Sequence, residues 1–255
     1  MAKIYKNNLN MRFNNLTYED FKAMAQDKKL SRYEKVGFPD TYRAGKEIRI
    51  FKDIESKLPS LKDNGSVTMD IGCGCSDIPH YMIERARQKS QTLVLVDSKE
   101  MLDQLPDDRV AQKIPTHFPD CPELLEHYAG YIDAIIAYSV IQYVFVEGNL
   151  FDFLDKSLTL LAPQGRMLIG DIPNLSMRKR FFKSDSGITA HRQFKATDEY
   201  PPKDLTHIEK GSLDDSVVMS LLKRARLAGF HSYIVPQAKD LPMANRREDI
   251  LIIRP

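Results

Sequence analysis

The stretch VTMDIGCGCSD, residues 67–77, decides the fold of this chain. Its first five residues have the apolar character of a buried strand, and Gly72 and Gly74 follow it directly. Glycine accepts a positive φ and has no Cβ, so such a turn lets bare backbone approach a ligand. Ser76 can cap a following helix whose N–H groups then face an anion in the turn. The stretch therefore predicts a strand, a ligand-binding turn and a helix.

The residues around this turn favour a cofactor with a ribose and few phosphates. A dinucleotide fingerprint has a further glycine five residues after its first, where this chain has Asp77, and a carboxylate is a poor neighbour for a pyrophosphate. A second apolar run, residues 93–96, ends in Asp97. This acid stands at about the 20-residue distance at which a βαβ unit delivers a carboxylate to ribose hydroxyls.

These residues resemble those of the class I S-adenosylmethionine-dependent methyltransferases. The family's acid and Gly-x-Gly-x-Gly turn correspond to Asp70, Gly72, Gly74 and Ser76, where serine replaces the third glycine. The other similar segments follow in the family's order: Asp97 and Ser98 with Met101, then IDAIIAYSVIQYV at 132–144, then LLAPQGRMLIG at 160–170. The resemblance covers residues 66–171 and about forty residues at the end of the chain.

The resemblance implies an α/β fold with a Rossmann-like, seven-stranded sheet. This sheet is mostly parallel with an antiparallel final strand, and helices cover both faces. The resemblance also implies S-adenosyl-L-methionine as the cofactor, with Asp97 on the ribose and Met101 against the adenine. The predicted cofactor-binding residues are Asp70, Gly72, Cys73, Gly74, Ser76, Asp97, Ser98, Met101, His117, Phe118 and Tyr138.

Composition sets the broad class of the protein. The 255 residues are 42% hydrophobic and 28% charged, as is ordinary for a globular enzyme. The net charge of +2 is too small to indicate a nucleic-acid partner. No apolar run approaches the roughly 20 residues that span a bilayer, and the first residues lack a secretory signal, so we expect a cytoplasmic protein. The three cysteines and six histidines have no metal-ligand spacing, so we predict no metal site.

The pattern of apolar residues indicates one cofactor-binding domain, residues 66–255, preceded by a helical, lid-forming segment, residues 1–65. Repeated strand–helix units place the ligand at the carboxyl ends of the strands. The predicted helices are 18–30, 46–58, 77–88, 99–105 and 214–228, and the predicted strands are 67–71, 92–96, 109–114, 134–138, 166–170, 231–237 and 249–254. Residues 172–212 form an insertion longer than ordinary loops, which we expect to cover the active site.

Methyl transfer from a sulfonium is an in-line displacement that depends mainly on holding the nucleophile in place. The candidate catalytic residues lie at strand ends or in the insertion: Gln142, Tyr143, Asp171 and His191. The candidate substrate-binding residues are cations suited to a carboxylate or phosphate: Arg43, Lys46, Arg178 and Arg180. Structural roles stay open, since Asp171 can cap a turn, His191 can be a solvated loop residue, and RKRFFK at 178–183 can be a solvated helix face.

The leading function is therefore methyl transfer to an oxygen or nitrogen of a small, anionic or sugar-like metabolite. A weaker similarity of GDIPNLSMRKRFF, residues 170–182, to bacterial enzymes of surface-polysaccharide and sugar biosynthesis favours a sugar. Three alternatives stay open: an RNA or protein methyltransferase, a nicotinamide-dependent oxidoreductase and a non-catalytic binding module. The mild charge argues against RNA, and the absence of a Tyr-x-x-x-Lys pair argues against the oxidoreductase.

Overall fold

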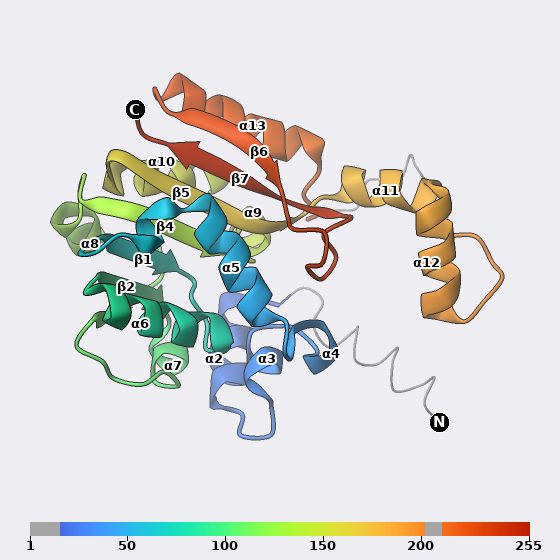
Figure 1. Cartoon of the computed structure of the whole chain (residues 1–255), viewed down its shortest axis with the longest axis horizontal. Coiled ribbons are helices and arrows are strands. Elements are labelled where there is room, and N and C mark those ends of the chain that lie inside the picture. Colours follow the sequence, from blue (N-terminus) through green and yellow to red (C-terminus); the bar gives the residue numbers. More distant parts are fainter. Residues whose placement is uncertain (1–15, 202–210) are drawn as a thin grey trace.

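A seven-stranded mixed sheet forms the centre of the structure, a computed structural model that describes residues 16–201 and 211–255 (Figure 1). The strands are β1 (Val67–Ile71), β2 (Thr92–Asp97), β3 (Ala111–Pro115), β4 (Ile132–Tyr138), β5 (Leu161–Pro173), β6 (His231–Pro236) and β7 (Arg247–Ile253). Their order is β3-β2-β1-β4-β5-β7-β6. The first five strands in this order, β3, β2, β1, β4 and β5, are parallel, whereas β7 is antiparallel to both β5 and β6. The predicted Rossmann-like methyltransferase sheet is confirmed.

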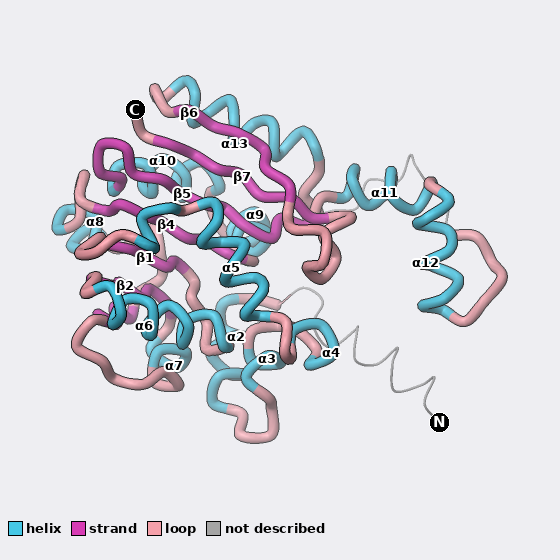
Figure 2. Tube along the Cα trace, in the orientation of Figure 1, coloured by secondary structure: helices cyan, strands magenta, loops and turns pink. Residues whose placement is uncertain are grey.

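Helices cover both faces of this sheet (Figure 2). On one face α5 (Glu47–Lys57) and α6 (Asp77–Lys89) share a buried apolar cluster with the strands. On the other face α8 (Pro122–His127), α10 (Leu150–Leu160) and α13 (Asp215–Leu227) share a second cluster. The remaining helices are α2 (Tyr18–Gln26), α3 (Arg32–Lys35), α4 (Asp40–Arg43), the 3₁₀ helix η1 (Pro59–Lys62), α7 (Lys99–Leu102), α9 (Ile141–Glu147), α11 (Leu175–Lys183) and α12 (Asp185–Lys195).

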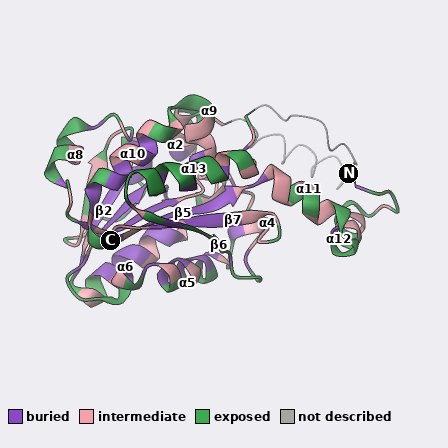
Figure 3. Cartoon of the chain, turned by 90° about the horizontal axis from the view of Figure 1, so that it is seen from above, coloured by how far each residue is buried: buried purple, intermediate pink, exposed green. Residues whose placement is uncertain are grey.

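Burial on both faces explains why the central strands are continuous apolar runs. In β2, Leu93 and Leu95 belong to the cluster with α5 and α6, whereas Val94 and Val96 belong to the cluster with α10 and α13. Successive side chains of a strand point to opposite faces, so a strand covered on both sides needs apolar residues throughout. Figure 3 shows these strands buried between layers of helix whose outer surfaces are exposed.

Two predicted boundaries differ most from the structure. Strand β5 begins at Leu161 rather than at residue 166, because residues on both sides of the Pro-x-Gly turn join the sheet. The first helix was predicted over residues 18–30, but α2 ends at Gln26, where the extended backbone of Asp27 caps it. Short helices α3 and α4 follow in the segment predicted to form a lid.

The insertion, residues 172–212, forms helices α11 and α12, which extend away from the sheet (Figure 1). None of the residues of α11 is buried, and in α12 only Gly187 is. That the insertion covers the active site stays a prediction, and its residues 202–210 lie outside the described parts of the chain. Among the described residues, no helix is both long and apolar enough to cross a membrane.

Candidate functional site

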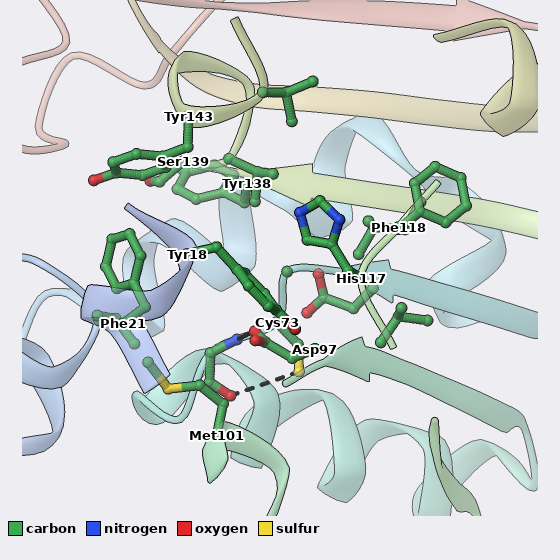
Figure 4. Close-up of a pocket in the computed structure, with 18 of the residues that line it drawn as sticks. Tyr18, Phe21, Cys73, Asp97, Met101, His117, Phe118, Tyr138, Ser139 and Tyr143 are labelled. Atoms are coloured by element: carbon green, nitrogen blue, oxygen red, sulfur yellow. Dashed lines mark hydrogen bonds between the residues drawn. The ribbon is translucent and has the colours of Figure 1, made fainter. Parts of the chain in front are cut away.

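A pocket lies at the carboxyl ends of β1, β2 and β4, where parallel α/β sheets bind their ligands (Figure 4). The glycine turn after β1 forms its floor, with Asp97 from β2 and Ser139 after β4. Helices α2 and α9 contribute aromatic side chains to its other walls, including Phe21 and Tyr143. The pocket thus joins segments that lie far apart in the sequence.

Backbone conformation and local packing both require glycine at positions 72 and 74 of this turn. Gly72 and Gly74 have φ values of +71° and +62°, which favour glycine. A Cβ on Gly72 would lie 2.6 Å from Val140 Cγ2, and a Cβ on Gly74 would lie 2.6 Å from Val36 Cγ1. The variant Gly74→Val would therefore disturb the protein itself, so a loss of binding in that variant would not isolate a ligand contact.

Two acids of the pocket, the buried Asp70 and the half-buried Asp97, have raised pKa values. Asp97 accepts hydrogen bonds from the Gly74 N–H (2.8 Å) and the Ser98 N–H (2.7 Å), yet burial raises its pKa to about 6. Burial, together with the negative charge of Asp97, raises the pKa of Asp70 to about 8. Both acids line the pocket. A ligand that carries positive charge or donates hydroxyl hydrogen bonds would compensate these carboxylates.

The start of helix α6 differs from the prediction. Ser76 occupies the cap position, but its side chain makes no capping hydrogen bond. Instead Glu47 Oε2, from α5, accepts hydrogen bonds from the N–H groups of Asp77 (2.6 Å) and Ile78 (3.1 Å). The expectation that these N–H groups face an anionic ligand is therefore wrong, because a carboxylate of the protein already binds them. Glu47 is 1% exposed, and burial raises its pKa.

Arg43, the last residue of α4, and Glu47, the first residue of α5, both line the pocket. The Nη2 of Arg43 donates to Ser139 Oγ (2.8 Å) and Asp171 Oδ2 (3.0 Å), and its Cζ lies 3.9 Å from the centre of the Phe38 ring. Its Nη1 is 3.9 Å from Glu47 Oε1. Within the described residues neither of these two atoms makes a hydrogen bond, and Glu47 Oε1 is fully buried. The two atoms thus form an ion pair without a hydrogen bond, and each can still bind a polar group of a ligand.

Helix α2 closes the pocket from the side of α9. Its Tyr18 N–H donates to Glu147 Oε2 (2.9 Å), and the Tyr18 ring meets the His117 ring edge-on at 4.5 Å between centroids. Phe21 makes a similar contact with Tyr143 at 4.9 Å. Burial raises the pKa of Tyr18 to about 12 and also raises that of Tyr143. These phenols stay protonated near neutral pH and can donate hydrogen bonds but cannot serve as ready bases.

The structure brings most of the predicted cofactor residues together. All of them except Ser98 line the pocket, and Ser98 lies directly behind it on Asp97. From the other predicted sets, Tyr143 and Arg43 line the same pocket. Their binding and catalytic roles remain predictions.

The other predicted residues do not line the pocket. Asp171 and Gln142 lie behind its wall, where Asp171 binds Arg43 and Gln142 Nε2 donates to the Ser139 carbonyl (2.7 Å). The rest lie further out: Lys46 donates to the Thr41 carbonyl, Arg180 pairs with Asp215, and His191 in α12 packs against Phe182; Arg178 lies on the surface of α11. The predicted base His191 is thus on an arm that points away from the pocket.

Asp77, which we expected near the cofactor, faces the N-terminal segment instead. Its carboxylate binds Arg32 (2.6 Å) and the Tyr33 hydroxyl (2.5 Å), and it does not line the pocket. Sequence reasoning missed Tyr18, Phe21 and Glu47 as pocket residues. Arg43 and Glu47 belong to different helices, so no helical spacing in the sequence indicated that they would pair. Among the described residues, no group of three or more His, Cys, Asp or Glu side chains could hold a metal ion.

The sequence matches no protein-family model and no curated protein. Solved structures are similar at the level of the fold. The plantazolicin methyltransferase BamL, solved with a desmethylplantazolicin analogue and SAH, is 15% identical with a TM-score of 0.57, over 98% of each chain. A SAM-dependent methyltransferase from Aquifex aeolicus is 14% identical with a TM-score of 0.52, over 88% of this chain and 99% of that one. The CurJ carbon methyltransferase is 15% identical with a TM-score of 0.54, over 92% of this chain, which spans only 64% of the CurJ chain. The chain therefore has the fold of the S-adenosylmethionine-dependent methyltransferases.

Proposed function

We propose that this chain binds S-adenosylmethionine in the pocket and transfers its methyl group to an oxygen or nitrogen of a small, anionic or sugar-like acceptor. The observation that carries the proposal is Asp97, held on the glycine turn by the Gly74 N–H at 2.8 Å. A carboxylate has about four lone-pair sites, and backbone N–H groups occupy two of those on Asp97. The others can accept hydrogen bonds from two ribose hydroxyls.

The other residues that line the pocket also suit this cofactor. Arg43 Nη1 and Glu47 Oε1, which lie 3.9 Å apart, match the carboxylate and ammonium of an α-amino acid, and Glu47 Oε1 has no hydrogen-bond partner within the described residues. The carboxyls of Asp70 and Asp97, whose pKa values are raised, favour a cationic ligand, such as a sulfonium. Met101 is 2% exposed and lines the pocket beside Asp97, where an adenine ring would lie.

The bound cofactor supplies a methyl group activated by a sulfonium, and the protein positions the nucleophile. Tyr143 lines the pocket as a protonated phenol and can orient the acceptor by donating a hydrogen bond. Asp171 acts through Arg43 as a positioning residue, because it binds the guanidinium from behind the pocket wall. The contact between Phe21 and Tyr143 closes one side of the pocket, which favours a small acceptor.

Calorimetry with S-adenosylhomocysteine tests this proposal. The variant Asp97→Ala should lose charge-assisted hydrogen bonds of roughly 1.5–3 kcal/mol, which corresponds to an affinity about 10- to 150-fold weaker. Asp103→Ala is the matched control, since Asp103 lies on the surface in an ion pair with Lys99 and should bind as the unaltered protein does. Equal affinity of the unaltered protein for a nicotinamide dinucleotide, or an unchanged Asp97→Ala affinity, would contradict the proposal.

A further inference from the structure

Three arginines gather where the start of β7 meets α11, and we name Arg178, Arg246 and Arg247 the arginine cluster. The Cζ of Arg246 lies 5.8 Å from the centre of the Phe182 ring in α11. The positive charges of Arg247 and Arg178 both act on Arg246 and, after burial, are the causes that lower its pKa. Only the Tyr42 hydroxyl, from α4, acts in the opposite direction.

Negative charge in the described residues does not balance the two members of this cluster at the start of β7, Arg246 and Arg247. Arg247 Nη1 pairs with Asp171 Oδ2 at 2.8 Å, but Asp171 also binds Arg43. Within residues 16–201 and 211–255, the guanidinium of Arg246 pairs with no carboxylate, and its one hydrogen bond reaches Asn245 Oδ1 at 3.5 Å. A half-buried guanidinium beside like charges, without an acidic partner, costs free energy unless a ligand supplies the negative charge.

The arginine cluster adjoins the pocket through Phe38. This ring lines the pocket, with Arg43 Cζ at 3.9 Å and Arg247 Cζ at 5.9 Å from its centre. The charge of Arg247 also acts on the hydroxyl of Tyr143, which lines the pocket on the side of α9. The pocket therefore has an acidic part around Asp70 and Asp97 and a border with strong positive charge.

We propose that the arginine cluster binds an anionic group, a carboxylate or a phosphate, of the methyl acceptor. This inference rests on the proposed function, because it identifies the class of acceptor for the same pocket. Guanidinium groups bind carboxylate and phosphate oxygens in pairs of parallel hydrogen bonds, and the Tyr42 hydroxyl can add a further donor. The acidic part of the pocket suits the cationic cofactor, so the two ligands occupy regions of opposite charge.

A stability measurement tests the cluster without knowledge of the acceptor. Arg246→Met keeps an apolar stem over Phe182 but removes the charge, so this variant should unfold at the same temperature as the unaltered protein or at a higher one. Arg224→Met is the matched control, since Arg224 is an exposed arginine that Asp155 does neutralise. It should gain no stability.

Inorganic phosphate and succinate, each compared with chloride at equal ionic strength, are the probes for the anion. Phosphate or succinate should raise the unfolding temperature of the unaltered protein and of Arg224→Met, and Arg246→Met should bind the same anion at least tenfold more weakly. The anion with the higher affinity distinguishes a phosphorylated from a carboxylated acceptor. All three proteins should bind S-adenosylhomocysteine equally.

Three results would overturn the inference: no stabilisation beyond that of chloride, an unchanged anion affinity in Arg246→Met, or a lower unfolding temperature of that variant without ligand. A loss of S-adenosylhomocysteine binding in Arg246→Met would assign the arginine to the cofactor pocket and also overturn it. Failure of the unaltered protein to bind S-adenosylhomocysteine contradicts the proposed function instead, so the two failures are distinguishable.

Discussion

At the scale of single residues, Asp97 combines two opposing effects. Burial disfavours its charged form, whereas the N–H groups of Gly74 and Ser98 stabilise that form, and the balance raises its pKa to about 6. The structure thus holds a carboxylate that is ionised near neutral pH but only by a small margin. Its proposed role as an acceptor of ribose hydroxyl hydrogen bonds requires the ionised form.

Cofactor affinity should therefore depend on pH through Asp97. Ribose hydroxyls that donate to the carboxylate favour its ionised form, so binding lowers the pKa and the affinity falls as the pH falls through about 6. The loss should approach tenfold for each pH unit below that value. Calorimetry with S-adenosylhomocysteine measures this loss over roughly pH 5 to pH 8, a range that brackets the raised pKa of Asp97. In Asp97→Asn the loss of affinity below about pH 6 should vanish, and an equally strong loss in that variant would assign it to another group.

At the scale of elements, Glu47 shows how one side chain can join two helices and a ligand site. It comes from the first turn of α5, and its Oε2 satisfies the first N–H groups of α6. Glu47 lines the pocket, and its Oε1 makes no hydrogen bond within the described residues. The same carboxylate can therefore stabilise α6 and bind a cation.

Glu47→Gln separates these two roles. Glutamine keeps an oxygen that can accept from the α6 N–H groups, so we expect a stability loss of about 0.5–2 kcal/mol, the range for helix caps. Loss of the charge should weaken S-adenosylhomocysteine binding about tenfold or more, because a hydrogen bond to a charged group contributes roughly 1.5–3 kcal/mol. Calorimetry with 5′-methylthioadenosine, which lacks the amino-acid part, is the control and should give unchanged affinity. Equal losses for both ligands would leave Glu47 with a structural role only.

Elements with a clear apolar period were predictable from the sequence, and those that depend on distant partners were not. The strands β1, β2 and β4 and the helix α13 were predictable, because the spacing of apolar residues within each segment indicates both its length and its buried positions. The insertion has no such pattern. Its charges and aromatic residues indicated a lid, but none of the described residues of α11 and α12 lines the pocket.

At the scale of the whole molecule, one part of the candidate site was predictable from local sequence and the other depends on contacts between distant segments. The cofactor part arises from one strand–turn–helix unit and the next strand, so the residues 70–101 alone indicated most of it. The charged part depends on contacts across the chain. Asp171 lies 128 residues from Arg43 and 76 from Arg247, and it binds both. No local spacing could predict that one carboxylate would join α4, β5 and β7.

Asp171 therefore should hold the N-terminal segment against the sheet. The side chain of Asp171 is 5% exposed and pairs with both Arg43 and Arg247. Asp171→Asn would remove the negative charge that these two guanidinium groups share. Breaking a buried ion pair by removing one partner costs about 3–5 kcal/mol, so the variant should unfold at a clearly lower denaturant concentration. Amide hydrogen exchange in residues 40–47 should accelerate more than exchange in α13, because Arg43 anchors that segment. Asp155→Asn, which breaks the exposed pair with Arg224, is the matched control and should change neither quantity appreciably. If both variants lost the same small stability, the N-terminal segment would be held by its apolar contacts alone, and the charged network would not join it to the sheet.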